Sequence, residues 1–314
     1  MLGNIVKSKY VSIDQTFLLK LLSRYRIEEC KSLRLLKEDL FSITYLIKTL
    51  KTDYILKIFD KTIPNSSIEY SFKLLQFLGN LDHRVPIPLF SRQGNFIDES
   101  LLNKKIVILS YLEGQSISTF SLDQVNDTFR KVGNLHLSMK TFSKKNPPLF
   151  PFSFVNHIHQ LIDEYFKIET SEDLLSEFIE VKKTAQFLLN QNHTAGLCHN
   201  DLKKNHLLFS NDRLNGILDF FCVYNFPLLL DVSALLLETC FDENGTPNFN
   251  LINNAIASYR ETIPLTNNQW SFLPQYLSLV SFFRYLLFRA QKSPQQALYQ
   301  TIYQNVKNCH AEIG

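Results

Sequence analysis

The stretch of sequence that decides the fold is LCHNDLKKNHLLFSNDRLNGILDFF (197–221). Two short apolar runs, HLLF and NGILDF, are joined by the turn-prone residues 210–212, which predicts a small β-hairpin. A cluster of polar residues with possible chemical roles lies in and beside these apolar runs: His199, Asp201, Asn205, His206 and Asp219. A tight hairpin would bring Asp201 and Asp219 to the same end, and buried carboxylates are costly unless they are paired or bind a metal ion. We therefore expect a divalent cation and a proton acceptor there.

The spacing of these residues strengthens the chemical interpretation. An H-x-D motif, a polar position five residues after the aspartate and a later strand ending in I-L-D-F form the layout of phosphoryl-transfer sites, with a catalytic Asp followed by two metal ligands. The alternative is a turn in which Asp and Asn side chains only cap backbone N–H groups.

Upstream of this stretch, the pattern predicts a small α+β unit. Residues 33–60 contain short β-type runs with charged breaks, which is typical of an antiparallel meander. Over 66–81, Ile68, Phe72, Leu75 and Leu78 recur at helical spacing, and KKIVILSYLEG (104–114) predicts a buried strand.

After about residue 115 the apolar spacing becomes helical, around 125–139, around 174–188 and from 231 to the C-terminus, with breaks near Pro247, Pro264 and Pro294. We therefore expect a mainly helical second unit with the hairpin in its middle.

Composition excludes several other classes. The 314 residues are 45% hydrophobic, and 33 Lys and Arg face 30 Asp and Glu without a one-sided basic stripe, so nucleic acid is not an expected partner. Asp231 and Arg284 interrupt the most apolar runs, so no membrane span and a cytoplasmic protein are expected. The five cysteines form no C-x-x-C pair, which fits reduced thiols rather than disulfides or zinc. No P-loop and no G-x-G-x-x-G motif is present.

Residues 198–245 resemble the aminoglycoside/choline phosphotransferase superfamily, which has a protein-kinase-like fold, and most closely its bacterial homoserine kinase branch. The resemblance rests on C-H-N-D-L, H-L-L-F, D-R-L-N-G-I-L-D-F and C-F-D-E-N-G, and it extends to YILKIF, VPIPLF, VILSYLEG, VGNLHLS and SYRETIPLT. It implies a two-lobed α+β fold with a small N-terminal sheet lobe over 1–112 and a larger, mainly helical lobe over 113–314. The site is expected in the cleft between the lobes.

Carried over residue by residue, the resemblance implies Asp201 as the base that orients the acceptor hydroxyl and His199 as the residue that holds the catalytic loop. Asp219 would bind Mg²⁺, and Lys57 would face the nucleotide phosphates. The alternative for Lys57 is an exposed lysine on an edge strand.

Further positions are interpreted with the same resemblance. Glu69 is either the ion-pair partner of Lys57 or a solvated helix charge. The hinge that meets adenine would lie at 109–113 and include Ser110 and Leu112. Asp231 and His136 are interpreted as structural, the former binding backbone near the catalytic loop and the latter packing in a helix.

The sequence also departs from the family pattern. His206 stands where the family has a metal-binding Asn, although Mg²⁺ prefers oxygen ligands, so Asn205 is a second candidate and Mn²⁺ a possible metal. The turn at 37–42, KEDLFS, has acidic residues and no glycine. Leu237, Glu238 and Thr239 replace a polar, tryptophan-containing run of the homoserine kinases.

The expected function is ATP-dependent phosphorylation of a small hydroxyl-bearing acceptor, first of all L-homoserine, with a place in threonine biosynthesis. Choline, another amino alcohol or an aminoglycoside is the alternative acceptor. A catalytically inactive kinase-like binding module is the third interpretation: the departures favour it, and the intact His199, Asp201, Asp219 and Lys57 oppose it. The sequence leaves the oligomeric state open.

Overall fold

The computed structural model describes residues 6–7, 12–27, 30–38, 42–99, 101, 104–147, 172–191 and 193–309. The chain folds as two compact units, which are Met1–Glu113 with Gly216–Phe221, and Gly114–Asn215 with Cys222–Gly314. The short segment Gly216–Phe221 therefore belongs with the N-terminal unit although it lies far along the chain. The sheet-based N-terminal unit and the larger helical unit confirm the α+β class.

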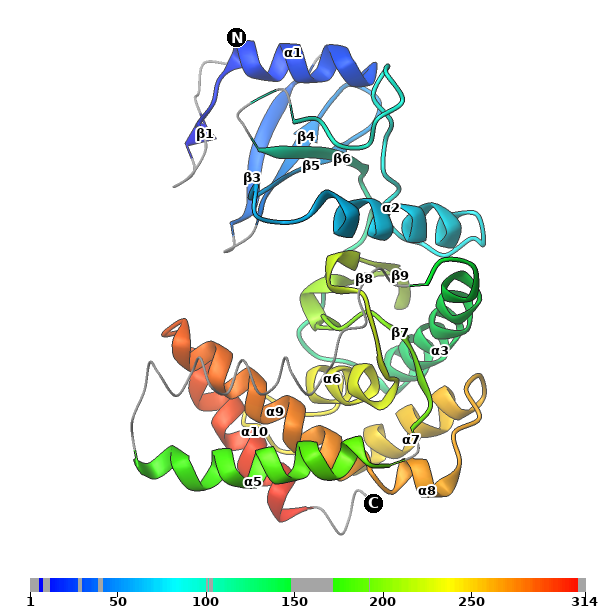
Figure 1. Ribbon diagram of the computed structural model, residues 1–314, viewed down its shortest axis with the longest axis vertical. Coiled ribbons are helices and arrows are strands. Elements are labelled where there is room, and N and C mark those ends of the chain that lie inside the picture. The colour runs from blue at the N-terminus through cyan, green and yellow to red at the C-terminus, as the bar shows by residue number, and fades with distance from the viewer. Residues whose placement is uncertain are drawn as a thin grey trace. The chain divides into compact units, whose positions relative to one another are not determined.

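The N-terminal unit is built on a four-stranded antiparallel sheet in the order β3-β4-β5-β6 (Figure 1). Its elements are β1 (Val6–Lys7), β2 (Ser12–Ile13), α1 (Gln15–Tyr25), β3 (Ser32–Glu38), β4 (Ser42–Lys48), β5 (Tyr54–Phe59), α2 (Asn65–Gly79) and β6 (Lys105–Ser110). The expected meander and strand are confirmed, whereas residues 39–41 of the acidic turn lie outside the described residues.

The sheet buries its two faces against different elements. Alternate strand residues such as Tyr45, Leu56 and Ile108 form one core cluster with the apolar side of α1. Helix α1 was not predicted, although its apolar residues recur at helical spacing: Phe17, Leu18, Leu21, Leu22 and Tyr25. Asp14 caps this helix by accepting a hydrogen bond from Phe17 N at 2.7 Å.

The expected second helix of this unit is confirmed as α2. Ile68, Phe72, Leu75 and Leu78 are all buried, as their spacing predicts. The Phe72 ring meets the Phe221 ring at 5.9 Å between centroids, and Phe221 meets Phe59 of β5 at 4.7 Å. The side chains of α2 and of the segment 216–221 thus meet beside β5.

The second unit is mainly helical. Its elements are α3 (Leu122–Lys145), α5 (Glu172–Leu189), β7 (Ala195–Cys198), η1 (Lys204–His206), β8 (Leu207–Ser210), β9 (Arg213–Ile217), η2 (Phe220–Cys222), β10 (Tyr224–Pro227), α6 (Leu229–Thr239), α7 (Phe249–Arg260), α8 (Asn267–Trp270), α9 (Leu273–Ala290) and α10 (Gln296–Asn308); β9 and η2 extend partly into the segment assigned to the first unit. The expected hairpin is β8–β9, and helix α9 packs against α5, α6 and α10 (Figure 1).

A second two-stranded pair, β7 with β10, was not expected from the sequence. Tyr224 lies opposite Cys198, and Pro227 lies opposite Ala195. Each strand has only four residues, and the runs AGLC and YNFP contain Gly, Asn and Pro, which are depleted in strands. Local propensity therefore gave no signal for this pair, which fixes the start of the loop that carries Asp201.

Close helix packing explains one glycine of the second unit. A Cβ atom on Gly133 of α3 would lie 1.8 Å from the Thr262 hydroxyl oxygen, just after α7. Since real Cβ atoms do not approach other atoms so closely, any other residue at this position would displace Thr262. Helix α3 carries His136 one turn further on, so this packing helps to place it.

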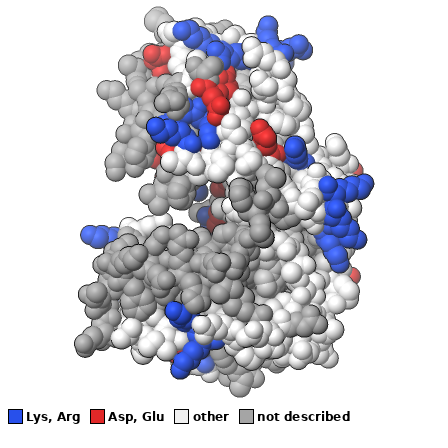
Figure 2. Space-filling view, viewed as in Figure 1, with Lys and Arg blue, Asp and Glu red and all other residues white. Residues whose placement is uncertain are grey.

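The distribution of surface charge and the length of the helices can be compared with what the sequence predicts about nucleic acid and membranes. On the face in Figure 2, described Lys and Arg side chains lie in separate groups, with Asp and Glu between some of them, rather than in one stripe. Among the described residues, no helix is long and apolar enough to cross a membrane.

Candidate active site

The loop that carries Asp201 runs from the end of β7 to the short helix η1, within the second unit. Asn200 adopts φ +61°, a left-handed conformation that Asn tolerates better than most residues. Its side-chain amide donates to the carbonyl oxygens of Cys198 at 3.2 Å and Cys222 at 3.0 Å. The loop therefore turns sharply just before Asp201 and is tied to the end of β7 and to the last residue of η2.

Asp231 of α6 binds the first half of this loop. Its carboxylate accepts hydrogen bonds from the backbone N–H groups of His199 at 2.6 Å and Asn200 at 2.8 Å. The structural interpretation of Asp231 is thereby confirmed. Burial raises the pKa of Asp231, but the hydrogen bonds from His136 and from the His199 backbone, with the nearby imidazoles, outweigh it and hold this pKa below its usual value.

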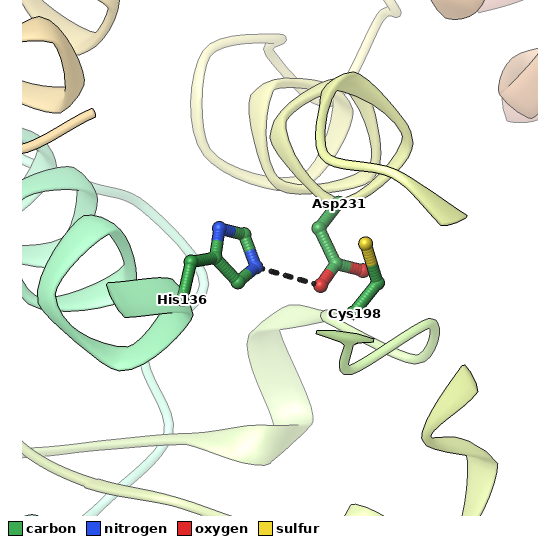
Figure 3. A group of neighbouring side chains, drawn as sticks. All are labelled: His136, Cys198 and Asp231. Atoms are coloured by element: carbon green, nitrogen blue, oxygen red, sulfur yellow. Dashed lines mark hydrogen bonds and ion pairs between the residues drawn. The ribbon is translucent and has the colours of Figure 1, made fainter. Parts of the chain in front are cut away.

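A buried cluster surrounds Asp231, and Figure 3 shows the ring of His136 directed at its carboxylate with the Cys198 side chain beside it. His136 Nε2 lies 3.0 Å from Asp231 Oδ2, and His136 Nδ1 lies 2.7 Å from the hydroxyl of Tyr259. Burial raises the pKa of Tyr259 well above its usual value, so its hydroxyl keeps its proton and can donate to Nδ1. His136 then presents Nε2–H to Asp231.

These three side chains do not fit a metal ion. Asp231 already accepts three hydrogen bonds, and His136 Nε2 carries the proton of one of them. Burial raises the pKa of the Cys198 thiol well above its usual value, and the thiol points toward the Phe226 carbonyl oxygen at 3.5 Å. We therefore assign this cluster to hydrogen bonding that fixes the loop.

The carboxylate of Asp201 is partly exposed and forms an ion pair with a neighbour in sequence. Lys203 Nζ donates to both carboxylate oxygens at 2.9 Å. The backbone N–H of Asp201 donates to Nδ1 of the fully buried His199 at 3.2 Å. Sequence reasoning missed Lys203, although its position two residues after the aspartate was visible.

His206 and Asn205, the two other candidate metal ligands of this loop, differ in their surroundings. Asn205 is exposed. His206 is buried, and its Nδ1 lies 2.9 Å from the backbone carbonyl oxygen of Asp201. A carbonyl oxygen can only accept, so Nδ1 carries a proton in this geometry and Nε2 holds the lone pair of a neutral ring.

Lys57 and Asp219 meet within the first unit. Lys57 lies on β5, an inner strand, and is buried, so it is neither exposed nor on a sheet edge. Its Nζ donates to Asp219 Oδ1 at 2.6 Å and lies 4.5 Å from the centre of the Phe221 ring. Lys37 of β3 approaches the other oxygen of Asp219 at 3.8 Å.

Asp219 combines a left-handed backbone with partial exposure. Its backbone adopts φ +69°, a conformation that Asp, like Asn, tolerates better than most residues. Its side chain is 19% exposed.

The three remaining candidates are placed as follows. Glu69 is exposed on α2, and no ion pair joins it to Lys57 among the described residues. Ser110 ends β6, where its N–H donates to the Ile87 carbonyl oxygen at 2.8 Å and its hydroxyl accepts from Ile87 N–H at 2.8 Å. Leu112 is half-buried two residues beyond the strand.

Comparison with known proteins gives three findings. The family model described as "Phosphotransferase enzyme family" matches residues 32–262. Homoserine kinase of Agrobacterium fabrum is 24% identical over 283 residues, which cover 89% of this chain and 86% of that protein. Homoserine kinase of Rhizobium johnstonii is 26% identical over 289 residues, with coverages of 89% and 86%.

Solved structures share the fold at low sequence identity. An amicoumacin kinase, hAmiN, in complex with AMP-PNP, Ca²⁺ and Ami, has a TM-score of 0.74 at 16% identity, covering 96% of this chain and 94% of that one. A microcompartment-associated aminopropanol kinase has a TM-score of 0.64 at 16% identity, with coverages of 95% and 96%. The fold is therefore the expected protein-kinase-like one, and this chain belongs to the phosphotransferase enzyme family.

Proposed function

We propose that this chain is an ATP-dependent kinase that transfers the γ-phosphate to the hydroxyl group of a small molecule, with L-homoserine as the first acceptor. The observation that carries the proposal is the 2.6 Å ion pair between Lys57 on an inner strand and Asp219 beyond the β8–β9 hairpin. A lysine and a carboxylate so placed are the phosphate-binding and metal-binding groups of kinases that transfer a phosphoryl group from ATP.

The bond changes of the proposed reaction are simple. The acceptor hydroxyl oxygen forms a bond to the γ-phosphorus, the bond from that phosphorus to the oxygen bridging to the β-phosphate breaks, and ADP leaves. Asp201 accepts the hydroxyl proton and orients the oxygen. Lys203 donates hydrogen bonds to both oxygens of the Asp201 carboxylate. It therefore holds the orientation of that carboxylate until the acceptor binds.

The residues around Asp219 fit a hard divalent cation. Carboxylate oxygens are the ligands that Mg²⁺ prefers, and the partners of Asp219 named above are lysine ammonium groups, which can move to the phosphates. Mg²⁺ or Mn²⁺, when bound, neutralises charge on the phosphate oxygens. Asn205 and the Nε2 atom of His206 are the further candidate ligands, and Lys57 binds the phosphates.

Adenine would meet the backbone beyond β6. The N–H of Ser110 is already bonded to Ile87, so Leu112 is the better candidate for the hinge contact. Glu69 has no role in this proposal because it is exposed and Lys57 pairs with Asp219.

The names of the similar proteins guide the choice of acceptor. The curated relatives named above are homoserine kinases and match this chain over 86% of their length, which favours L-homoserine. The solved structures include an aminopropanol kinase, which keeps amino alcohols as the second acceptor class. Choline and aminoglycosides complete the panel to be tested.

The test is a turnover screen with ATP and either Mg²⁺ or Mn²⁺ over L-homoserine, aminopropanol, choline and an aminoglycoside. O-methyl-L-homoserine is the matched control because a methyl group replaces the hydroxyl hydrogen and the rest of the molecule is unchanged. We expect ADP and a phosphorylated product with one hydroxyl-bearing acceptor and none with the methyl ether. Turnover with an amino alcohol but not with homoserine would change the proposed acceptor. The absence of both turnover and nucleotide binding under every condition would favour a non-catalytic binding module.

A further inference from the structure

A buried ion pair in the second unit lies outside the candidate site described so far. Glu238, near the end of α6, has a side chain only 7% exposed. Its carboxylate accepts hydrogen bonds from the Lys204 backbone N–H at 2.9 Å, from Arg284 Nη1 of α9 and from the hydroxyl of Tyr299 on α10. Burial raises the pKa of Glu238, but the positive charge of Arg284 and the hydrogen bonds outweigh it and hold this pKa below its usual value.

Arg284 extends the same network to a second backbone group of the loop. Its Nη2 donates to the Leu202 carbonyl oxygen at 2.8 Å, and its Nη1 also donates to the Tyr299 hydroxyl at 3.0 Å. The planar guanidinium can serve the loop and Glu238 at once because its donors are arranged in a fixed fork. Two helices, α6 and α9, thus hold the segment that directly follows Asp201.

Most backbone hydrogen bonds of the loop that carries Asp201 are made to side chains rather than to a neighbouring strand or helix. Asp231 accepts from the first two N–H groups, His199 accepts from Asp201 N–H, and His206 donates to Asp201 C=O. Glu238 and Arg284 bind the next two groups, on Lys204 and Leu202. The second half of the loop therefore depends on this ion pair as the first half depends on Asp231.

We propose that Glu238 and Arg284 are positioning residues that set the orientation of Asp201 through the backbone of residues 202–204. The inference rests on the proposed kinase activity, because it assigns to Asp201 the role of base. Neither residue touches the reacting atoms. Displacing a catalytic group by about 1 Å can lower a rate by about 100-fold, so a loosened loop would lower kcat although the protein stays folded.

The alternative is that the pair only stabilises the helical unit. Breaking a buried ion pair lowers stability in either case, so a lower melting temperature does not separate the two roles. A loss of kcat in protein that is still folded, with the KM for ATP unchanged, does separate them. The proposed contacts to the phosphates and adenine, Lys57 and Leu112, and the first metal ligand, Asp219, belong to the other unit. The proposal therefore predicts that kcat falls much more than the KM for ATP changes.

The test compares Arg284→Lys with Arg130→Lys. Lysine keeps the charge beside Glu238 but lacks the second donor that reaches Leu202, whereas Arg130 forms an exposed two-contact pair with Glu261, at 2.7 and 3.2 Å, away from the loop. We expect kcat to fall at least about tenfold in Arg284→Lys with the KM for ATP within about twofold. Arg130→Lys should keep both parameters. Glu238→Gln is the second variant if Arg284→Lys does not fold.

Hydrogen exchange of the Lys204 amide provides a readout that does not need activity. It should become faster in Arg284→Lys and in Glu238→Gln, and stay unchanged in Arg130→Lys. A folded variant with normal kcat contradicts the positioning role, whatever its melting temperature or exchange rate. If the parent protein shows no turnover with any acceptor, the proposed function fails, and unchanged exchange at Lys204 in the variants would separately overturn the assignment of the ion pair to the loop.

Discussion

Two aspartates of this molecule, Asp219 in the first unit and Asp231 in the second, occupy contrasting surroundings. Asp231 is fully buried, and its partners are two backbone N–H groups and an imidazole. Asp219 is partly exposed, and its ion-pair partners are the ammonium groups of Lys57 and Lys37. Backbone groups cannot leave without moving the chain, whereas a lysine side chain can rotate away.

The difference indicates which carboxylate can take part in a reaction. Asp231 fixes the conformation of a loop, and any ligand would have to replace hydrogen bonds that the loop needs. In the proposed function, Asp219 would exchange an ammonium for a metal ion, and the released lysine would bind phosphate. The fixed carboxylate has a structural role, and we propose a ligand-binding role for the exchangeable one.

The largest effect should follow from removing the fixed carboxylate. Asp231→Ala leaves two backbone N–H groups and His136 without their acceptor in a buried site, so we expect the free energy of unfolding to fall by about 3–5 kcal/mol. Denaturant titration measures the loss. The control is Glu261→Gln in the exposed pair with Arg130, which should leave the free energy of unfolding nearly unchanged. Equal costs would show that Asp231 is not a fixed structural group.

Removing the exchangeable carboxylate should weaken ligand binding more than it lowers stability. Asp219→Asn keeps an oxygen that can accept from Lys57 but loses the charge that binds a divalent cation. We expect the affinity for Mg·ATP, measured by calorimetry, to fall at least about tenfold, which is about 1.4 kcal/mol. Lys57→Ala should weaken the same binding.

The control for this prediction is the melting temperature, which should fall less in Asp219→Asn than in Asp231→Ala. Unchanged Mg·ATP affinity in folded Asp219→Asn would remove Asp219 from the metal site.

Acid should weaken the second unit through its buried carboxylates. The folded-state pKa of Glu238 is lowered, so its stabilising contribution is complete above its unfolded value of about 4.3 and is lost as the pH falls through the lower folded value. Asp231 contributes in the same direction. As the pH decreases below about 4.3, the melting temperature should therefore decrease. This decrease with pH should be less steep in Glu238→Gln. An identical pH dependence in that variant would contradict this account of Glu238.

Much of the fold follows from residue spacing. Helix α2 was predicted because Ile68, Phe72, Leu75 and Leu78 share one helical face, and the hairpin because a turn separates two apolar runs. The pair β7–β10 was not predicted because its short strands lack β propensity and join segments separated by the hairpin.

The candidate residues followed from motifs, but their partners did not. Arg284 was visible as a charge within the apolar run SLVSFFRYLLF and served only to exclude a membrane span. Its partner Glu238 lies 46 residues earlier, on another helix, so only the tertiary structure joins them. Buried hydrogen bonds to loop backbone have no local sequence pattern, and for this reason the support of the Asp201 loop was not predicted.

The smallest effect is expected at His206. Like Asp231 it is hydrogen bonded to loop backbone, and like Asp219 it is a candidate metal ligand. His206→Asn can keep the hydrogen bond to the Asp201 carbonyl through the amide N–H and adds an oxygen ligand. Mg²⁺ prefers oxygen and Mn²⁺ accepts nitrogen more readily, so the ratio of Mn²⁺- to Mg²⁺-supported turnover should fall by about two- to fivefold. An unchanged ratio would mean that His206 acts only through its backbone hydrogen bond.

The central claim is that Asp201 is the proton acceptor of a phosphoryl transfer, and Asp201→Asn tests it most directly. Asparagine keeps the size of the side chain but removes the charge and the basic oxygen. Turnover of ATP with the acceptor found in the screen should fall by about 100-fold or more, while Mg·ATP affinity and the melting temperature stay close to those of the parent protein. Parental turnover in a folded Asp201→Asn protein would contradict the claim.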